Sequence, residues 1–281
     1  MTKPVVLMIL DGLGINPECS NNAACQSQTP RLDALFVTCS HATLLCSGEA
    51  VGLPDGQQGN SEVGHLNLGA GRIVYQDLLR ISRAIDDGSF EQNDAFVRMM
   101  TRLKENDQAL HLMGLLSDGG VHSHQDHLYA LLKMAKNMGL EKVYVHAFMD
   151  GRDVSPTSGV HYLEQLQEQL TAIGVGKLAT VSGRYYAMDR DKRWERVERA
   201  WKVRGEGEKV DDVIAAMHAS YDNDVTDEFI VPMVCIGDEG RIHENDGIIF
   251  YNFRADRAKQ LSRSFVDPSF DGFDRGDWQS I

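Results

Sequence analysis

Five short apolar runs recur along the chain, and each is followed by a polar loop that carries charged or histidine side chains. The runs occupy residues 5–10, 109–116, 142–149, 177–181 and 247–253. Short apolar runs bounded by turn residues are typical of strands that are buried on both faces of a sheet. We therefore expect a β-strand at each run.

Amphipathic helices separate these runs in the later part of the chain. Apolar residues follow helical spacing at residues 96–103, 128–138 and 160–173. Gly139 and Gly174 follow the last two stretches, and glycine is the residue that most often ends a helix. Strands that alternate with helices predict an α/β protein with a parallel or mostly parallel sheet and helices on its faces.

The first 75 residues differ from the rest, because they hold one apolar run and four of the five cysteines. A chain of 281 residues can form one large domain or two smaller ones. We expect the boundary near residue 76, with residues 1–75 and 76–281 as the two parts. One strand rarely makes a sheet alone. Residues 1–75 are therefore expected to pair with another chain or with sequence beyond Ile281.

Composition narrows the class of protein. The net charge of -13 leaves no basic surplus to neutralise phosphates, so we expect no nucleic-acid partner. The first apolar run is too short for a membrane span or a signal peptide, so no membrane partner is expected. The number of cysteines is odd and no C-x-x-C pair occurs, which favours free thiols in a reducing, cytoplasmic compartment.

The loops after the apolar runs carry many charged side chains, with a bias toward arginine. They contain Asp11, Asp118, His122, Asp150, Arg152, Asp153, Arg184, Arg190, Arg254 and Arg257. Ligands of open α/β sheets bind at the carboxyl ends of the strands, and the guanidinium group binds phosphate or carboxylate with two hydrogen bonds. The pattern predicts a site for a small ligand with two anionic groups. The alternative is a set of solvated polar loops.

Two further patterns suggest metal or ligand contacts. Asp11 follows an apolar run, so its carboxylate can coordinate a divalent metal or accept a proton, or it can simply begin a turn. The segment HSHQDH offers an H-x-H spacing that can bind zinc. We favour His122 as the residue that faces a ligand, and His124 and His127 as structural residues.

Ser61 lies in the stretch GNSEVGHLNLGAGR, which approaches three known motifs and completes none. The hydrolase motif G-x-S-x-G fails at Val63, the dinucleotide motif fails at Val74, and no G-K-[ST] triplet follows. We expect Ser61 to be the N-cap of a helix over SEVGHLNL. The free N–H groups there also suit a phosphoryl group, so cap and nucleophile both remain open.

Seven motifs resemble, in order, the cofactor-independent (2,3-bisphosphoglycerate-independent) phosphoglycerate mutases. They are VVLMILDGLG, GNSEVGHLNLGAGRIVYQDL, SDGGVHSH, DGRDVSP, SGRYYAMDRDKRWER, TDEFIVP and YNFRADRAKQL. The resemblance runs from residue 5 to about residue 276. It implies an alkaline-phosphatase-like domain, incomplete here and begun by residues 1–75, with an inserted and nearly complete α/β transferase domain at 76–281.

The resemblance also implies a reaction, cofactors and roles for residues. The reaction is the interconversion of 3-phosphoglycerate and 2-phosphoglycerate in glycolysis through a phosphoserine, with two manganese (or magnesium or cobalt) ions. Ser61 is similar to the nucleophile, Asp11 and Ser61 to ligands of one metal, and Asp153 to a proton shuttle. The implied substrate contacts are His122, Arg152, Asp153, Arg184, Arg190, Arg254 and Arg257.

The chain is shorter than members of that family. We expect the other metal ligands and a catalytic lysine to lie beyond Ile281, so the metal site is incomplete and this chain alone has little or no activity. At full length we expect a cytoplasmic monomer. The alternatives are an anion-binding or phosphoglycerate-binding fragment without catalysis, and another phosphomutase of the alkaline-phosphatase superfamily, such as a phosphopentomutase.

Overall fold

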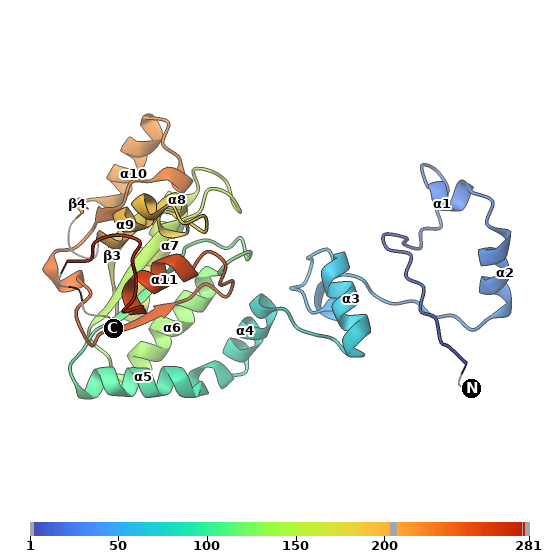
Figure 1. The fold of residues 1–281 in the computed structure, drawn as a ribbon, viewed down its shortest axis with the longest axis horizontal. Helices are drawn as coiled ribbons and strands as arrows, with labels where there is room; N and C mark the ends of the chain where they lie inside the picture. The colour runs from blue at the N-terminus through green and yellow to red at the C-terminus, as the bar shows by residue number, and fades with distance from the viewer. Residues whose placement is uncertain (1–2, 203–206, 277, 279–281) are drawn as a thin grey trace. The chain divides into compact units, whose positions relative to one another are not determined.

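A mixed β-sheet organises the larger of two compact units, 1–79 and 80–281, in the computed structural model (Figure 1). The structure describes residues 3–202, 207–276 and 278. Within these residues the sheet has six strands, in the order β4-β5-β3-β2-β1-β6. The strands are β1 (Leu110–Leu115), β2 (Val143–Met149), β3 (Lys177–Gly183), β4 (Glu208–Lys209), β5 (Met233–Val234) and β6 (Gly247–Phe250).

Four strands form the parallel part of the sheet. β1 pairs with β2 and with β6, so that Leu110 lies opposite Val143 on one side and Gly247 on the other. β2 pairs with β3 in the same sense, whereas β5 runs antiparallel to β3. The expectation of an α/β fold with a mostly parallel sheet is confirmed. The carboxyl ends of β3, β2, β1 and β6 therefore lie along one edge of the sheet.

Helices cover both faces of this sheet. From residue 77 onward the helices are α4 (Asp77–Asp86), α5 (Asp94–Glu105), α6 (Gln125–Met138), α7 (Gly159–Ile173), α8 (Arg184–Ala187), α9 (Trp194–Lys202), α10 (Val213–Asp222) and α11 (Lys259–Val266), with 3-10 turns η2 (Ser89–Gln92), η3 (Asp227–Phe229) and η4 (Asp238–Gly240). Of these, α4 belongs to neither of the two cores described below. The three helices predicted from apolar spacing correspond to α5, α6 and α7. Gly139 and Gly174 end α6 and α7 as expected.

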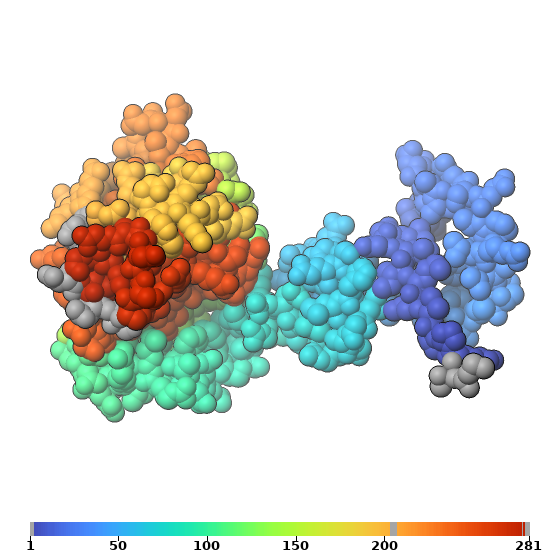
Figure 2. Space-filling model, in the orientation of Figure 1, coloured from blue at the N-terminus to red at the C-terminus, as the bar shows by residue number. Residues whose placement is uncertain are grey.

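Alternate side chains of β1 point into two different cores. Leu110 and Leu112 pack with residues of α5, α6, α7 and α10 on one face of the sheet. Met113 and Leu115 pack with α8, α9 and α11 on the other face. Figure 2 shows the atoms of this unit, coloured from green to red, as one closely packed body. Burial on both faces explains why the strands are apolar throughout.

Besides His122, three histidines are buried within this unit. His111 lies between Asp246, with Nε2 at 3.3 Å from Oδ2, and His146, whose Nε2 is 2.9 Å from the His111 Nδ1 atom. His127 contacts the Ser82 hydroxyl at 3.0 Å. Burial lowers the pKa of each imidazole, and for His127 burial and the nearby His124 lower it to about 4. All three rings are therefore neutral at neutral pH.

We expect the free energy of unfolding to fall as the pH decreases from about 6.5 to about 4, because unfolded histidines bind protons in this window and these buried ones do not. His127 should account for up to about 3 kcal/mol of the decrease. His127→Gln should flatten the pH dependence, measured by urea unfolding, while the exposed control His218→Gln leaves it unchanged. An unaltered slope in His127→Gln would contradict this expectation.

The smaller unit has little core of its own. It contains α1 (Ala23–Gln26), α2 (Pro30–Thr38), η1 (Gly48–Val51) and α3 (Ser61–Ala70). Its buried apolar cluster consists of Val51, Leu53 and Val63 among the described residues. The strand predicted at residues 5–10 is wrong in this structure, where the segment has no regular structure and Val5 is 96% exposed. A strand needs a neighbour to bond with, and no described strand pairs with this segment.

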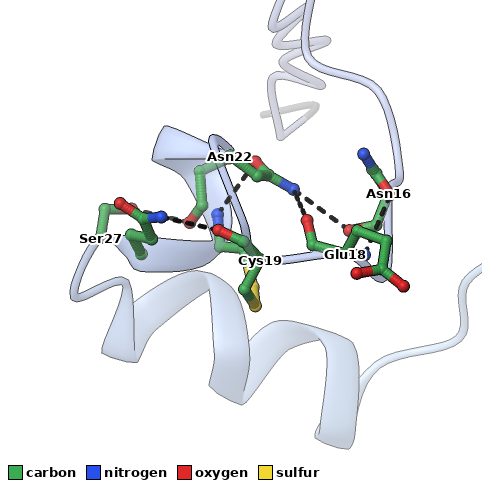
Figure 3. The surroundings of a disulfide bond; sticks show 8 residues. Asn16, Glu18, Cys19, Asn22 and Ser27 are labelled. Carbon is green, nitrogen blue, oxygen red and sulfur yellow. Dashed lines mark hydrogen bonds between the residues drawn. A yellow bond between two sulfur atoms is a disulfide. The ribbon is translucent and has the colours of Figure 1, made fainter.

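The expectation of five free thiols is also wrong. Cys19 and Cys25 form a disulfide, whereas Cys39, Cys46 and Cys235 are free. The pair lies in a turn that Asn22 stabilises, since its side chain accepts a hydrogen bond from the Cys25 N–H and donates to the carbonyl oxygen of Glu18 (Figure 3). This turn brings the two cysteines to a Cα–Cα distance of 5.2 Å, within the range of a disulfide. Their separation of six residues in the sequence does not by itself indicate that they are close in space.

No helix among the described residues is both long enough and apolar enough to span a bilayer.

Candidate functional site

In the second unit, a group of charged side chains lies where the parallel strands end. Asp150, Arg152 and Asp153 follow β2, Arg184 begins α8 directly after β3, and Arg254 lies in the loop after β6. The loop after β1 contributes His122. Because these strands are neighbours in the sheet, residues far apart in sequence meet at one edge.

Arg184 is the buried centre of this group. Its side chain is 3% exposed, and its Nη1 atom lies 2.6 Å from the Asp150 carboxylate and 2.7 Å from Asp153 Oδ2. Asp150 is itself fixed, since it accepts hydrogen bonds from the Ser117 hydroxyl and from main-chain N–H groups of Arg152 and Asp153. Burial opposes the charge on Arg184, but the bond to Asp153 and the two carboxylates raise its pKa overall. Arg184 is therefore a fixed cation.

Asp256 joins a second part of the group. Its carboxylate lies 3.1 Å from Arg190 Nη1, 3.8 Å from Arg254 Nε and 3.6 Å from His122 Nδ1. His122 is buried, and its pKa is lowered by burial and then by the charge of Arg184. The imidazole is therefore neutral at neutral pH, and Asp256 is the internal counter-ion of two arginines.

Two more arginines complete the cationic group. Arg152 is half-exposed and pairs with Glu228 at 3.2 Å. Arg257 donates a hydrogen bond to the Met188 carbonyl oxygen at 3.1 Å. Burial lowers the pKa of Arg257, and the charges of Arg190, Arg184 and Arg152 lower it further. Mutual repulsion of this kind is relieved when an anion binds among the guanidinium groups.

Several buried polar atoms of this site have no hydrogen-bond partner in the described part of the chain. They are the Nε of Arg184, the Nδ1 of His122 and the Oδ1 of Asp256. An unpartnered buried donor costs about 1–3 kcal/mol, and unpartnered groups in native proteins are concentrated at functional sites. Of these atoms, the Arg184 Nε–H group is a donor, and together with the nearby guanidinium groups it can bind an acceptor oxygen of a small anion.

Asp11 and Ser61 meet in the first unit. The Ser61 hydroxyl donates a hydrogen bond to Asp11 Oδ2 at 2.7 Å, and the His65 Nδ1 atom lies 3.1 Å from the same hydroxyl oxygen. Ser61 is the first residue of α3, not its cap as expected. The Asn60 side chain caps the helix by accepting from the Val63 N–H at 3.1 Å. The hydroxyl is therefore left free to contact Asp11.

This pair suits part of a site for a hard divalent cation, because carboxylate and hydroxyl oxygens are the ligands that such ions prefer. Among the residues that the structure describes, no three or more histidine, cysteine, aspartate or glutamate side chains gather in a way that could hold a metal. The zinc interpretation of HSHQDH has no support, since His124 caps α6 and His127 is bonded to Ser82. Asp11 and Ser61 thus offer two donors of a larger coordination shell.

Asp150 and Asp153, which pair with Arg184, were expected from the sequence, whereas Asp256 and Glu228, which pair with other arginines, were not. Ser117, which donates to Asp150, was also not expected. Asp256 stands between two arginines in RADR, and this alternation of charge could have identified it. Glu228 gives no such signal, because its partner Arg152 lies 76 residues away.

The fold and this cluster define a class: an α/β protein with a cluster of arginines at the carboxyl edge of its sheet. The family model described as BPG-independent PGAM N-terminus matches residues 81–281, and the chain belongs to this family.

Similar proteins cover nearly the whole chain. It is 56% identical over 279 residues to a 2,3-bisphosphoglycerate-independent phosphoglycerate mutase of Clostridium perfringens, which includes 97% of this chain and 54% of the relative. The enzyme of the same name from Moorella thermoacetica is 56% identical over 281 residues, or 98% and 55%. The chain thus spans about half the length of the curated relatives it matches.

A solved structure is also similar. A crystal structure of Leishmania mexicana phosphoglycerate mutase at low cobalt concentration superposes with a TM-score of 0.73 at 34% sequence identity. The match includes 95% of this chain and 52% of the other.

Proposed function

We propose that this chain supplies the substrate-binding site and the phosphoryl-accepting serine of a phosphoglycerate mutase, which interconverts 3-phosphoglycerate and 2-phosphoglycerate. Residues 1–75 would be the N-terminal part of an alkaline-phosphatase-like domain, and residues 76–281 the transferase domain. The names and extents of the relatives support this proposal. A cytoplasmic location and a monomeric full-length enzyme remain predictions.

The observation that carries the proposal is the arginine cluster at the ends of β2, β3 and β6. Phosphoglycerate has a phosphate at one end and a carboxylate at the other, and it needs at least two cationic grips. Arg184 is fixed by the carboxylates of Asp150 and Asp153, and Arg257 is repelled by its cationic neighbours. Guanidinium groups can hold both ends of the substrate and offset the charge of the transferring phosphoryl group.

The proposed reaction uses Ser61 and Asp153. The Ser61 oxygen forms a bond to phosphorus while the bond to the glycerate oxygen breaks, and the reverse step returns the phosphoryl group to the other hydroxyl. Asp11 accepts the hydrogen bond of the Ser61 hydroxyl and can orient it for attack. Asp153, held beside Arg184, would carry the proton between the two glycerate hydroxyls.

Asp11 and Ser61 would also hold one divalent metal of the proposed enzyme. A bound manganese, magnesium or cobalt ion would lower the pKa of the serine hydroxyl and neutralise charge on the phosphoryl group. The cobalt named for the Leishmania mexicana structure supports metal dependence but not a particular metal here.

Calorimetry can test the binding part of the proposal on this chain. We propose titration with 3-phosphoglycerate, glycerate and inorganic phosphate at equal ionic strength. If the arginines grip both ends, 3-phosphoglycerate should bind at least about tenfold more tightly than either single-ended probe. Equal affinities for all three would argue against a phosphoglycerate site. Binding without turnover by the longer enzyme would favour the alternative of an anion-binding module.

We expect residues 1–281 alone to show little or no mutase turnover with manganese. Asp11 and Ser61 offer two protein oxygens, fewer than the four to six donors that a divalent cation takes, and we propose that other residues of the longer enzyme supply further ligands. An enolase-coupled assay would compare this chain with the longer enzyme at equal concentration. Rates from the chain alone that approach those of the longer enzyme would contradict the proposal of an incomplete metal site.

A further inference from the structure

The loop between β2 and α7, residues 150–158, carries two of the proposed substrate-binding residues, Arg152 and Asp153. Asp150 holds its first turn from within, since the Oδ1 atom accepts main-chain hydrogen bonds from Arg152 at 3.1 Å and from Asp153 at 3.0 Å. The second half of the loop forms a turn of its own, in which the Ser155 carbonyl oxygen accepts hydrogen bonds from the Ser158 hydroxyl at 2.7 Å and from the Ser158 N–H at 3.2 Å. Groups from another part of the fold also bond to this half as it enters α7.

Asp227, in η3, holds that second half. Its side chain is fully buried, and its Oδ2 atom accepts a hydrogen bond at 2.7 Å from the N–H of Gly159, the first residue of α7. Its main-chain N–H donates to the Pro156 carbonyl oxygen at 2.9 Å. An N–H group in the first turn of a helix has no partner within the helix, and the helix dipole favours a negative charge there. Asp227 thus bonds the loop on both sides of its entry into α7.

Tyr221 fixes the other oxygen of this carboxylate. Its hydroxyl, near the end of α10, donates a hydrogen bond to Asp227 Oδ1. Burial raises the pKa of Tyr221 and the bond to Asp227 raises it further, so the phenol stays protonated and remains a donor. The carboxylate therefore has a single orientation, set by α10 on one side and α7 on the other.

Two glycines bring η3 against both arginine-bearing loops. A Cβ atom on Gly151 would lie 2.9 Å from the main-chain nitrogen of Glu228, and one on Gly183 would lie 2.3 Å from the Glu228 carbonyl oxygen. Both distances are shorter than real Cβ contacts allow. These glycines directly precede Arg152 and Arg184. The turn is therefore packed on the main chain of the site at two points.

We propose that Asp227 is a positioning residue for the anion site. Its carboxylate, oriented by Tyr221, fixes the loop at 150–158. Arg152 and Asp153 on that loop thereby keep their positions relative to Arg184. The effect on ligand binding rests on the function proposed above. The effect on the loop does not, and it can be measured without any ligand.

Two substitutions test this proposal in the 281-residue chain. Asp227→Asn keeps the shape but replaces one acceptor oxygen by an amide that cannot accept, and Tyr221→Phe removes only the orienting hydroxyl. We expect amide hydrogen exchange at 151–159 to become faster in both variants. The affinity for 3-phosphoglycerate should fall at least about tenfold in Asp227→Asn, and by less in Tyr221→Phe, because small misplacements of binding groups are costly.

Asp246→Asn is the matched control. Asp246 is also buried and accepts main-chain hydrogen bonds, from Ala109 at 2.9 Å and from His243 at 2.7 Å, but it does not bond to the 150–158 loop. This variant should unfold more easily, with loop exchange and affinity as in the wild type. If Asp246→Asn lost as much affinity for 3-phosphoglycerate as Asp227→Asn, general destabilisation would explain the loss in both variants. That result would overturn the proposal.

Other outcomes separate the two proposals. Unchanged exchange at 151–159 in both Asp227→Asn and Tyr221→Phe would overturn the positioning role, whatever the affinities. If the wild-type chain binds no 3-phosphoglycerate, the proposed function fails, and the exchange data still decide the role of Asp227.

Discussion

Ser61→Ala should abolish phosphoenzyme formation in the longer enzyme of which we propose this chain forms part. The substitution removes the only atom of residue 61 that can accept a phosphoryl group. Turnover should fall at least about 10⁴-fold, as it does when a covalent nucleophile is lost in other enzymes. The measurement is phosphate label retained on denatured protein after incubation with labelled 3-phosphoglycerate, together with the enolase-coupled rate.

The fold should survive this substitution. Asn60, not Ser61, caps α3, and alanine is a good residue for the first turn of a helix. Ser27→Ala provides a control in the same unit, since this exposed hydroxyl donates a hydrogen bond to the nearby Ala24 carbonyl oxygen. The control should retain both label and turnover. Label retained on the Ser61→Ala protein would show that another residue accepts the phosphoryl group.

The parallel part of the sheet could be predicted from sequence, because each of its strands is an apolar run followed by turn residues. The runs at 109–116, 142–149, 177–181 and 247–253 correspond to β1, β2, β3 and β6. Val5–Leu10 has an equally strong apolar pattern and yet forms no strand here. An apolar run states a preference for burial, whereas a strand also requires a neighbour with free hydrogen-bonding groups. The pattern cannot show whether that neighbour is present.

The cationic half of the candidate site could also be predicted, together with Asp150 and Asp153, but the acids Asp256 and Glu228 could not. Arginines after strands follow from the rule that ligands bind at the carboxyl ends of parallel strands. Which acid pairs with which arginine depends on contacts across long sequence separations, such as Arg152 with Glu228. The role of Asp227 is harder to predict, because it bonds to a main-chain N–H group 68 residues away. Such a bond does not depend on the side chains of the loop, so the sequence of the loop gives no sign of it.

Arg184→Ala should have the second large effect, on both stability and binding. Arg184 donates to Asp150 at 2.6 Å and to Asp153 at 2.7 Å, and its removal would leave two carboxylates with no cation between them. Breaking a buried ion pair by removing one partner costs about 3–5 kcal/mol, so the free energy of unfolding should fall by an amount of that order. Affinity for 3-phosphoglycerate should fall about 100-fold or more, because a buried charged contact to the ligand is lost.

Arg184→Lys separates the two effects. Lysine keeps the positive charge but cannot bridge two carboxylates and a ligand with one planar group, so stability should recover in part while affinity stays low. Arg196→Ala is the control, since Arg196 pairs with Asp189 at 3.7 Å and makes no contact with Asp150 or Asp153. Urea unfolding and calorimetry on all three folded variants would distinguish the cases. Affinity within threefold of the wild type in Arg184→Ala would mean that Arg184 braces the loop and does not contact the ligand.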